Sequence, residues 1–378
     1  MFYILSRYYE QNSAPTNHAL SFVRGFSELG VKAEWVFIIP YGDFAKCDQQ
    51  FDGITIRYLW KERIARNRVL RHLYKHWAYA KFFFSLKKGD TVLLLGMSEY
   101  LHYLVRRKGI KVYHERTEHP KAVKVSKCKF YNIHYNDDCS RADGIFVISN
   151  ALKTYFESVG VAEEKVHVIN MVVDAKRFDH IVKAEGVEPY IAYCGKASNI
   201  KDGVDDLIKA FAIVAKQREN IKLYVIGEAP PKESNNHDLV ETLGLTDRIV
   251  FTGVVPAKEM PQLLVNAQML ALARPNSLQN KYGFPTKLGE YLLSGNPVVV
   301  TKVGDIPLFL HDKETALMSE CRDVEAFAHN IIWALDHPEE ARKIGQNGKE
   351  VAERSFNYLT ETKKMCDVMF EPTKEKMI

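Results

Sequence analysis

The sequence of 378 residues lacks the features that mark membrane-spanning, secreted and zinc-binding proteins. It has no apolar run of the roughly 20 residues that a membrane-spanning helix needs. The short apolar run Met1–Leu5 has neither a basic lead nor a small-residue cleavage site, so it predicts a buried first strand and not a signal peptide. The six cysteines form no C-x-x-C pair, which disfavours a structural zinc site and favours reduced thiols in a cytoplasmic protein.

Two further absences limit the cofactors. No G-x-G-x-x-G motif follows a predicted strand, which argues against a nicotinamide-dependent dehydrogenase. No Asp-x-Asp pair lies at a strand end, where carboxylates would hold a divalent cation. We therefore expect an activity that uses no metal ion and no other cofactor.

The net charge of +5 is unevenly distributed. The window Arg57–Lys129 holds 19 Lys and Arg against 5 Asp and Glu, and aromatic residues are interleaved with the cations. This pattern fits a peripheral surface at the inner face of the membrane, which would meet anionic lipid or a lipid-linked acceptor. It fits equally well a solvated pair of helices with ordinary core aromatics. Nucleic acid is not favoured as a partner, because no recognition motif accompanies the charge.

Short apolar runs alternate with amphipathic stretches along the whole chain, in which 46% of the residues are hydrophobic. The runs Val92–Leu95 and Val298–Val300 do not alternate with polar residues, which is typical of parallel strands covered by helices on both faces. The length and this alternation predict two doubly wound α/β domains. The polar segment Lys183–Pro189 predicts the boundary between them. The domains would then cover residues 1–183 and 184–355, followed by a C-terminal helix, 356–378, that can pack back on the first domain.

A first chemical signal precedes the apolar run at 298–300. Pro285 fits the first turn of a helix and Gly295 the position just after its end, which predicts a short helix over 286–294. The start of such a helix presents unpaired N–H groups and the positive end of the helix dipole, so it suits a diphosphate. Thr286 adds a hydroxyl and Lys287 a cation there. Glu290 lies one turn further on the same face, where its carboxylate would reach ribose hydroxyls.

A second signal follows the predicted strand Tyr190–Cys194. The next loop carries Lys196 and Lys201 between Gly195 and Gly203. Parallel sheets bind ligands outside the carboxyl ends of their strands. Two lysines at that place can neutralise a diphosphate leaving group as fixed charges. The two segments together predict a site for a nucleoside diphosphate in the second domain.

Together these segments resemble the retaining glycosyltransferase group 1 family. Further matches are Tyr224–Glu228, Val250–Gly253 and the stretch Val168–Phe178. The resemblance covers most of the chain and implies the GT-B fold, which has two facing Rossmann-like domains with a cleft between them. It also implies that the second domain holds a nucleotide-sugar donor.

Carried over position by position, the resemblance implies that Lys196 and Lys201 act in catalysis by holding the donor diphosphate. Glu290 matches the second Glu of the family's Glu-x7-Glu motif and would bind the ribose. The residues implied to bind the donor are Gly195, Gly227, Gly283, Phe284, Thr286, Lys287, Leu288 and Glu290. The sequence departs from the family at Tyr282, which replaces the first Glu of the motif, and at Lys196, which replaces an Arg and loses its bidentate phosphate geometry.

The first domain offers a cluster of polar residues after a predicted strand, with the sequence Tyr-His-Glu-Arg-Thr-Glu-His-Pro over 113–120. Family members often have a His near the donor sugar at the corresponding place, so the resemblance implies that His114 or His119 acts in catalysis. Glu118 could orient the acceptor. Asn17 and His18 stand where the family has a Gly-Gly loop, and they are the other residues expected to bind the acceptor.

The resemblance implies transfer of a sugar, with retention, from a UDP- or GDP-sugar to a saccharide or a lipid-linked acceptor. The form Phe-Pro-Thr-Lys-Leu-Gly-Glu-Tyr is similar to a subgroup that handles bacterial surface polysaccharides and other glycoconjugates. Two alternatives stay open. One is a nucleotide-sugar epimerase of the same fold. The other is a non-catalytic scaffold that binds a nucleotide-sugar, because Tyr282 replaces a Glu of the motif.

Overall fold

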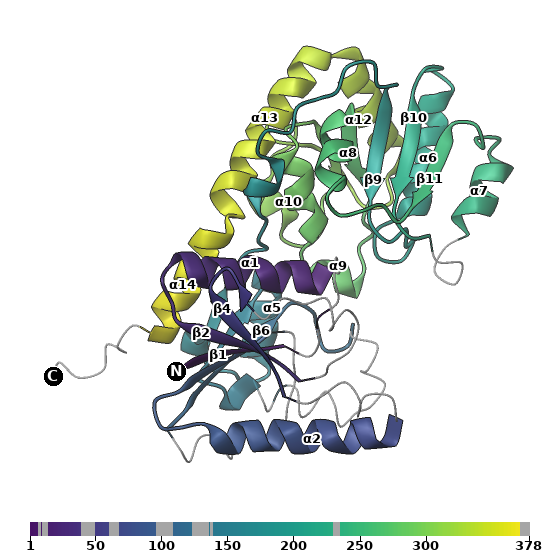
Figure 1. The fold of residues 1–378 in the computed structure, drawn as a ribbon. Coiled ribbons are helices and arrows are strands. Elements are labelled where there is room, and N and C mark those ends of the chain that lie inside the picture. Colours follow the sequence, from purple (N-terminus) through teal and green to yellow (C-terminus); the bar gives the residue numbers. More distant parts are fainter. Residues whose placement is uncertain are drawn as a thin grey trace. The chain divides into compact units, whose positions relative to one another are not determined.

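The computed structural model describes residues 1–6, 9, 14–38, 50–59, 68–95, 109–122, 136, 139–229 and 235–370. The chain forms two compact units (Figure 1), one made of Met1–Val172 and Tyr358–Ile378 and the other of Val173–Asn357. Each unit contains a largely parallel β-sheet with α-helices packed on it. The α/β class predicted from the sequence is therefore confirmed.

The division between the units falls earlier in the chain than the sequence indicated. We expected the boundary at Lys183–Pro189, but residues 173–183 pack on the C-terminal unit. The N–H of Val173 donates to the carbonyl of Phe356 (2.9 Å), and the ammonium of Lys183 donates to the carbonyl of Ala267 (3.1 Å). The expected range 1–183 for the first domain is corrected to end at residue 172, because these contacts tie the following segment to the second unit.

The sheet of the N-terminal unit has the strand order β3-β4-β2-β1-β5-β6-β7-β8 and is parallel except for the pair β3–β4. The predicted first strand, β1, lies inside the sheet between β2 and β5, as its apolar sequence requires. The strands are β1 (Phe2–Ser6), β2 (Ala33–Phe37), β3 (Gln50–Phe51), β4 (Ile54–Tyr58), β5 (Thr91–Leu94), β6 (Lys111–Arg116), β7 (Gly144–Val147) and β8 (Val166–Val168).

Helices cover both faces of this sheet. On one face, α1 (Ala14–Glu28) and α14 (Tyr358–Phe370) enclose a core with β1 and β2, whereas α2 (Arg68–Ser85) packs on the other face (Figure 1). Helix α5 (Asn150–Ser158) and the 3₁₀ turn η4 (Glu163–Lys165) connect β7 to β8. Helices α1 and α14 meet closely, because a Cβ atom at Gly25 would lie 2.2 Å from Oγ1 of Thr362. The C-terminal helix is thus part of the N-terminal unit.

The sheet of the C-terminal unit is wholly parallel, in the order β11-β10-β9-β12-β13-β14. Its central strands are buried on both faces, which explains their unbroken apolar runs. The strand order changes direction between β9 and β12, and this is where such sheets form a ligand crevice. The strands are β9 (Tyr190–Cys194), β10 (Lys222–Ile226), β11 (Ile249–Gly253), β12 (Met269–Leu272), β13 (Val298–Thr301) and β14 (Leu317–Ser319).

The helices of this unit follow the predicted alternation. The expected helix over 286–294 is present as α10, and Gly295 after it has a left-handed φ of 73°. The 3₁₀ turn η5 (Ala175–Phe178) precedes β9. The helices are α6 (Val204–Ala215), α7 (Asn236–Thr242), α8 (Met260–Asn266), α9 (Leu278–Tyr282), α10 (Thr286–Leu293), α11 (Ile306–Phe309), α12 (Val324–Asp336) and α13 (Pro338–Ser355).

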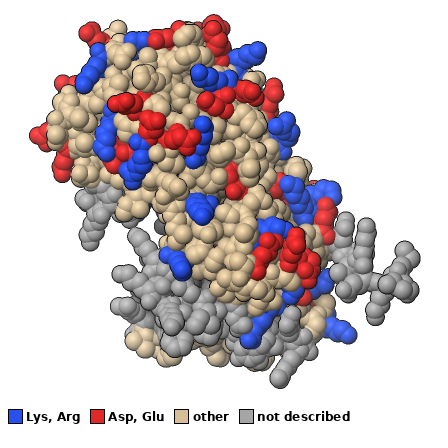
Figure 2. Space-filling view, turned by 180° about the vertical axis from the view of Figure 1, so that it is seen from behind, with Lys and Arg blue, Asp and Glu red and all other residues tan. Residues whose placement is uncertain are grey.

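The charged side chains of the C-terminal unit are mixed in sign. Figure 2 shows Lys and Arg interspersed with Asp and Glu over the face of this unit that it presents. The basic window 57–129 belongs to the N-terminal unit, and its residues 60–67, 96–108 and 123–129 lie outside the described ones. Within the described ranges, no helix combines the length and the hydropathy needed to cross a membrane.

Candidate functional site

The loop between β9 and α6, residues 195–203, is here called the lysine loop. It begins and ends at glycines with positive φ, 138° at Gly195 and 65° at Gly203. A Cβ atom at Gly203 would lie 2.0 Å from the carbonyl oxygen of Ala273, which follows β12. Only glycine allows this close approach. The loop is therefore held against the carboxyl end of the neighbouring strand, at the crevice of the sheet.

The buried carboxylate of Asp202 anchors the lysine loop to its neighbouring elements. Asp202 is only 3% exposed and accepts hydrogen bonds from the Lys287 ammonium (2.6 Å) and the Tyr193 hydroxyl (2.8 Å). The Nε of Arg274 lies 3.5 Å from its other oxygen. Burial raises the pKa of the Asp202 carboxyl, but Lys287 and Arg274 lower it by more, so that the net pKa lies below its usual value. Asp202 is thus an ionised group that joins the loop to β9, to the end of β12 and to α10.

The same network fixes the backbone at both lysines of the loop. The carbonyl of Lys196 accepts from the Tyr193 hydroxyl (2.7 Å). The carbonyl of Lys201 accepts from the side-chain amide of Asn280 (2.7 Å) and from Nε of Arg274 (3.3 Å). Both lysines are exposed residues. The loop therefore presents two cations on a backbone that is ordered before any ligand binds, which is the arrangement that stabilises a developing anion best.

Helix α10 begins next to the lysine loop. Pro285 precedes its first turn, and no side chain of the described chain caps it, so the first N–H groups are available to a ligand. The ammonium of Lys287 turns towards Asp202, so this residue offers its N–H and not its cation at the helix start. The Tyr291 hydroxyl accepts from the Cys194 N–H (2.5 Å) and donates to the Cys194 carbonyl (3.1 Å). These bonds set the helix directly against the end of β9.

Glu290, expected to bind a ribose, has a partner that the sequence did not suggest. Its carboxylate forms an ion pair with Arg177 of η5, and Arg177 also donates to the carbonyl of Ala257 (3.2 Å). Glu290 is one-quarter exposed, so it remains within reach of a ligand. Thr286 and Glu290 are both partly exposed on the same side of α10.

Several of the remaining donor candidates have structural explanations. Phe284 and Leu288 have buried side chains, and Phe284 packs against the aromatic rings of Phe309 and Phe356. A Cβ atom at Gly227 would lie 2.4 Å from the carbonyl oxygen of Gly195, so this glycine lets the turn after β10 cross the lysine loop. Gly283 closes α9, where its N–H donates to the carbonyl of residue 279 (2.9 Å).

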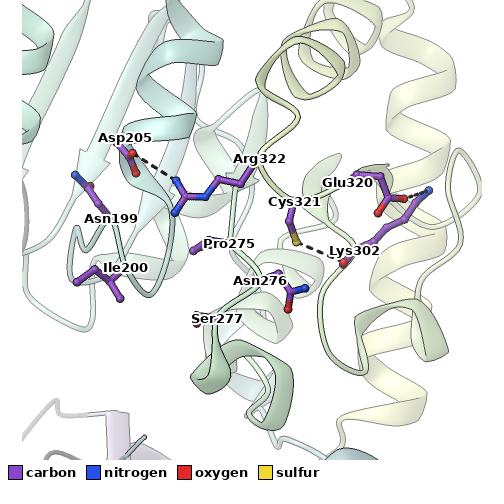
Figure 3. A pocket seen from close by; sticks show the side chains of 10 residues that line it. All are labelled: Asn199, Ile200, Asp205, Pro275, Asn276, Ser277, Lys302, Glu320, Cys321 and Arg322. Carbon is purple, nitrogen blue, oxygen red and sulfur yellow. Dashed lines mark hydrogen bonds and ion pairs between the residues drawn. The ribbon is translucent and has the colours of Figure 1, made fainter.

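A polar pocket of about 500 Å³ adjoins the lysine loop on the side of β12, β13 and β14 (Figure 3). Asn199 and Ile200 of the loop form one wall, and Arg322 reaches across towards Asp205 (3.8 Å). None of the residues expected to bind the donor lines it. The ten lining residues are Asn199, Ile200, Asp205, Pro275, Asn276, Ser277, Lys302, Glu320, Cys321 and Arg322. Their mixed donors and acceptors suit a ligand with many hydroxyl groups.

In the N-terminal unit, His18 of α1 contacts a carboxylate at the end of β6. Its Nε2 forms a short hydrogen bond with Glu115, a residue that we had not singled out. Asn17, the preceding residue, is exposed, and Glu118 is half-buried. The parallel geometry explains the pair, because the start of a helix and the carboxyl end of a neighbouring strand lie at the same edge of a sheet.

The two candidate histidines are buried. His114 on β6 has no exposed surface, and its Nδ1 lies 2.6 Å from a guanidinium nitrogen of Arg116. His119 is 4% exposed, its ring lies 4.2 Å from the ring of Tyr155, and its Nδ1 accepts from the Lys121 N–H (3.1 Å). Burial and, to a smaller extent, the nearby charge of Lys121 lower the pKa of His119. His119 is therefore neutral at neutral pH.

In the C-terminal unit, the lysine loop and the start of α10 both lie next to the carboxyl end of β9. The contact between Lys287 and Asp202 joins the helix start to the lysine loop. The candidates Asn17, His18, His114, Glu118 and His119 belong to the other unit.

The C-terminal unit matches a known family. Residues 188–337 fit the family described as glycosyl transferases group 1. The chain is 27% identical over 200 residues to the MMP alpha-(1->4)-mannosyltransferase of Mycolicibacterium hassiacum, and the matched region covers 52% of this chain and 46% of that protein. It is 25% identical over 194 residues to the N-acetyl-alpha-D-glucosaminyl L-malate synthase of Bacillus anthracis, and this match covers 51% of the chain and 48% of that protein. The matched region thus spans about half the length of these relatives.

Solved structures show the same fold over nearly the whole chain. The structure of HepE from Anabaena in complex with UDP superposes with a TM-score of 0.76 and covers 97% of this chain and 98% of HepE, at 16% identity. At a sequence identity this low, the structural similarity establishes the fold and nothing further. Residues 188–337, which include the lysine loop and α10, thus match the group 1 glycosyltransferases, and the chain has the GT-B fold.

Proposed function

We propose that this protein is a glycosyltransferase that moves a sugar from a UDP- or GDP-sugar to a saccharide or lipid-linked acceptor with retention of configuration. Synthesis of a surface polysaccharide or another glycoconjugate is the proposed setting, in the cytoplasm. One observation carries the proposal. Lys196 and Lys201 lie on a loop that the ionised Asp202 holds in place. This loop lies beside the uncapped start of α10, inside the region that matches the family.

The donor would bind by its diphosphate. The two lysine ammonium groups of the loop supply positive charge on one side. The first N–H groups of α10 and the Thr286 hydroxyl supply donors on the other, where the helix dipole also favours an anion. Glu290 would accept hydrogen bonds from the ribose, with Arg177 holding its carboxylate in place.

The chemical step then needs little beyond charge and position. The bond between the sugar's anomeric carbon and the diphosphate oxygen breaks, and the electron pair leaves with the nucleoside diphosphate. The acceptor hydroxyl attacks the same face of the sugar, and its proton passes to the departing phosphate oxygen. Lys196 and Lys201 stabilise the charge that develops on that oxygen, which is commonly the largest catalytic contribution.

The N-terminal unit would supply the acceptor side. Asn17 and the His18–Glu115 pair offer polar groups at the carboxyl edge of its sheet, and Glu118 lies on the loop that follows β6. Of the two histidines, His119 on that loop is retained as a catalytic candidate. His114 is assigned a positioning role through Arg116, because it has no exposed surface.

A ligand screen followed by product analysis tests the proposal. Thermal-shift measurements with UDP, GDP, ADP and their sugars should reveal one base that raises the melting temperature, since a ligand bound only by the folded protein stabilises it. The stabilising sugar nucleotide should then give a product whose anomeric configuration matches the donor. An isomer formed from the donor without any acceptor would show an epimerase instead. Binding without turnover against any acceptor would show a scaffold.

A variant and a chelator test the proposed roles. Lys201→Ala should nearly abolish transfer while leaving the far-ultraviolet circular dichroism unchanged, because the side chain is exposed and only its backbone belongs to the buried network. Transfer should continue in excess EDTA, because the proposal places no metal ion at the diphosphate. An active Lys201→Ala enzyme, or loss of activity in EDTA, would refute the respective assignment.

A further inference from the structure

Helix α2 of the N-terminal unit exposes a row of large apolar side chains. Successive residues of an α-helix are about 100° apart, and on that basis all five of these side chains fall within an arc of about 100°, over a length of roughly 23 Å. They are Val69 (68% exposed), Leu70 (54%), Leu73 (63%), Trp77 (50%) and Phe84 (59%). We call this row the α2 stripe.

The α2 stripe is not the face that packs on the sheet. The opposite side of the helix is buried and contributes Tyr79, Phe82 and Phe83 to a core with Val92 and Leu94 of β5. The helix therefore has two apolar faces, one packed on the sheet and one exposed. The other exposed large apolar side chains of the described chain are scattered, as is normal for a protein surface, whereas a contiguous apolar row marks an interaction site.

The charge around the stripe identifies the kind of partner. The sequence of α2 contains four Lys and Arg and no Asp or Glu. At the edge of the stripe, the Lys81 ammonium lies 4.9 Å from the centre of the Trp77 ring. Lys87, Lys88 and Lys111 are exposed at the end of the helix and at the start of β6. Within the described part of the chain, none of these four lysines is in an ion pair.

We propose that the α2 stripe docks on the surface of a bilayer that contains anionic lipid. An apolar row that includes a tryptophan and has cations beside it matches a helix lying in the interface, where the apolar side chains enter the acyl boundary and the ammonium groups meet phosphates. A second copy of this chain fits less well, because association through the stripe would bring the unpaired lysines of both copies together. The inference goes beyond the proposed function, since it requires neither nucleotide nor sugar.

Vesicle sedimentation of the full chain tests the proposal. The protein should bind phosphatidylcholine vesicles that contain phosphatidylglycerol, and it should bind pure phosphatidylcholine vesicles less tightly. Leu70→Gln/Leu73→Gln/Trp77→Gln should reduce the partition coefficient by about tenfold or more, because the apolar contribution is lost while the charge is kept. The matched control removes three exposed apolar side chains of the other unit, as Val182→Gln/Leu243→Gln/Leu308→Gln, and should bind like the wild type.

Two further measurements keep the result interpretable. Circular dichroism and the thermal shift with the stabilising nucleotide should be the same in wild type and triple variant, so that lost vesicle binding is not loss of the fold or of the donor site. Quenching of Trp77 by brominated lipid should place its ring at the acyl boundary. Wild-type protein that ignores anionic vesicles, or a triple variant that binds them normally, would overturn the proposal. A dimer that dissociates in the triple variant would overturn it in favour of self-association.

Discussion

Replacing Asp202 by Asn removes the carboxylate that anchors the lysine loop. The amide keeps the shape of the side chain, but it removes the negative charge beside the Lys287 ammonium, 18% exposed, and the Arg274 guanidinium, 3% exposed. Removing one partner of a buried ion pair typically costs about 3–5 kcal/mol. Because Lys287 keeps some contact with water, we expect the lower end, about 3 kcal/mol.

This cost is measurable by thermal unfolding followed by circular dichroism. For a unit the size of Val173–Asn357, it corresponds to a fall in melting temperature of about 6–12 °C. Lys287→Met and the double variant complete a thermodynamic cycle, in which the two changes together should cost less than their sum by about 1–3 kcal/mol. A melting temperature of Asp202→Asn within about 2 °C of the wild type, or strict additivity in the cycle, would refute the anchoring role.

Three further substitutions test other parts of the account. Gly203→Ala should lower the free energy of unfolding by about 2–5 kcal/mol, because the new Cβ would both strain the left-handed backbone and clash with the carbonyl of Ala273. Gly244→Ala is the control, since Gly244 has a similar φ of 66° but open space around it, and it should cost only about 1–2 kcal/mol. Urea unfolding measures both. Glu290→Gln should weaken UDP or GDP binding about tenfold but leave inorganic pyrophosphate binding unchanged in calorimetry, since Glu290 would touch only the ribose. Burial lowers the pKa of His167, so the unfolded chain binds the extra proton and stability should fall as the pH drops below about 6.5. His167→Gln should flatten that fall, and an unchanged pH profile would contradict it.

Local sequence signals predicted most of the elements that build the site. The unbroken apolar runs located β5 and β13 as strands buried on both faces. Pro285 and Gly295 located the two ends of α10 within one residue, because helix ends depend on residues that are adjacent in sequence. The same reasoning placed Lys196 and Lys201 on a loop at the end of β9.

The contacts that order the loop could not be predicted in this way. Asp202 meets Lys287, 85 residues further along the chain, and nothing in the sequence around either residue indicates the pair. We expected Lys287 to be a cation beside the phosphates, whereas its ammonium donates to the buried carboxylate of Asp202. Arg177 was overlooked for the same reason, since its partner Glu290 is 113 residues away. Such pairs follow from the order of the strands, which hydropathy patterns do not specify.

The domain boundary shows a similar limit. The polar composition of Lys183–Pro189 correctly marks an exposed segment, but the change of unit occurs where backbone groups find new partners. Residue Val173 pairs with Phe356, far away in sequence, and this bond transfers the following segment to the second unit. Composition indicates exposure, whereas the boundary depends on tertiary hydrogen bonds.

Calorimetric titration with the stabilising nucleoside diphosphate tests the central claim most directly. The comparison is between the wild type, Lys196→Gln/Lys201→Gln and the control Lys216→Gln, which removes an exposed lysine at the far end of α6. Loss of two charge-assisted contacts to the diphosphate should weaken binding by about a hundredfold or more in the double variant and leave the control unchanged. Equal affinity in all three proteins would show that the lysine loop does not hold the donor.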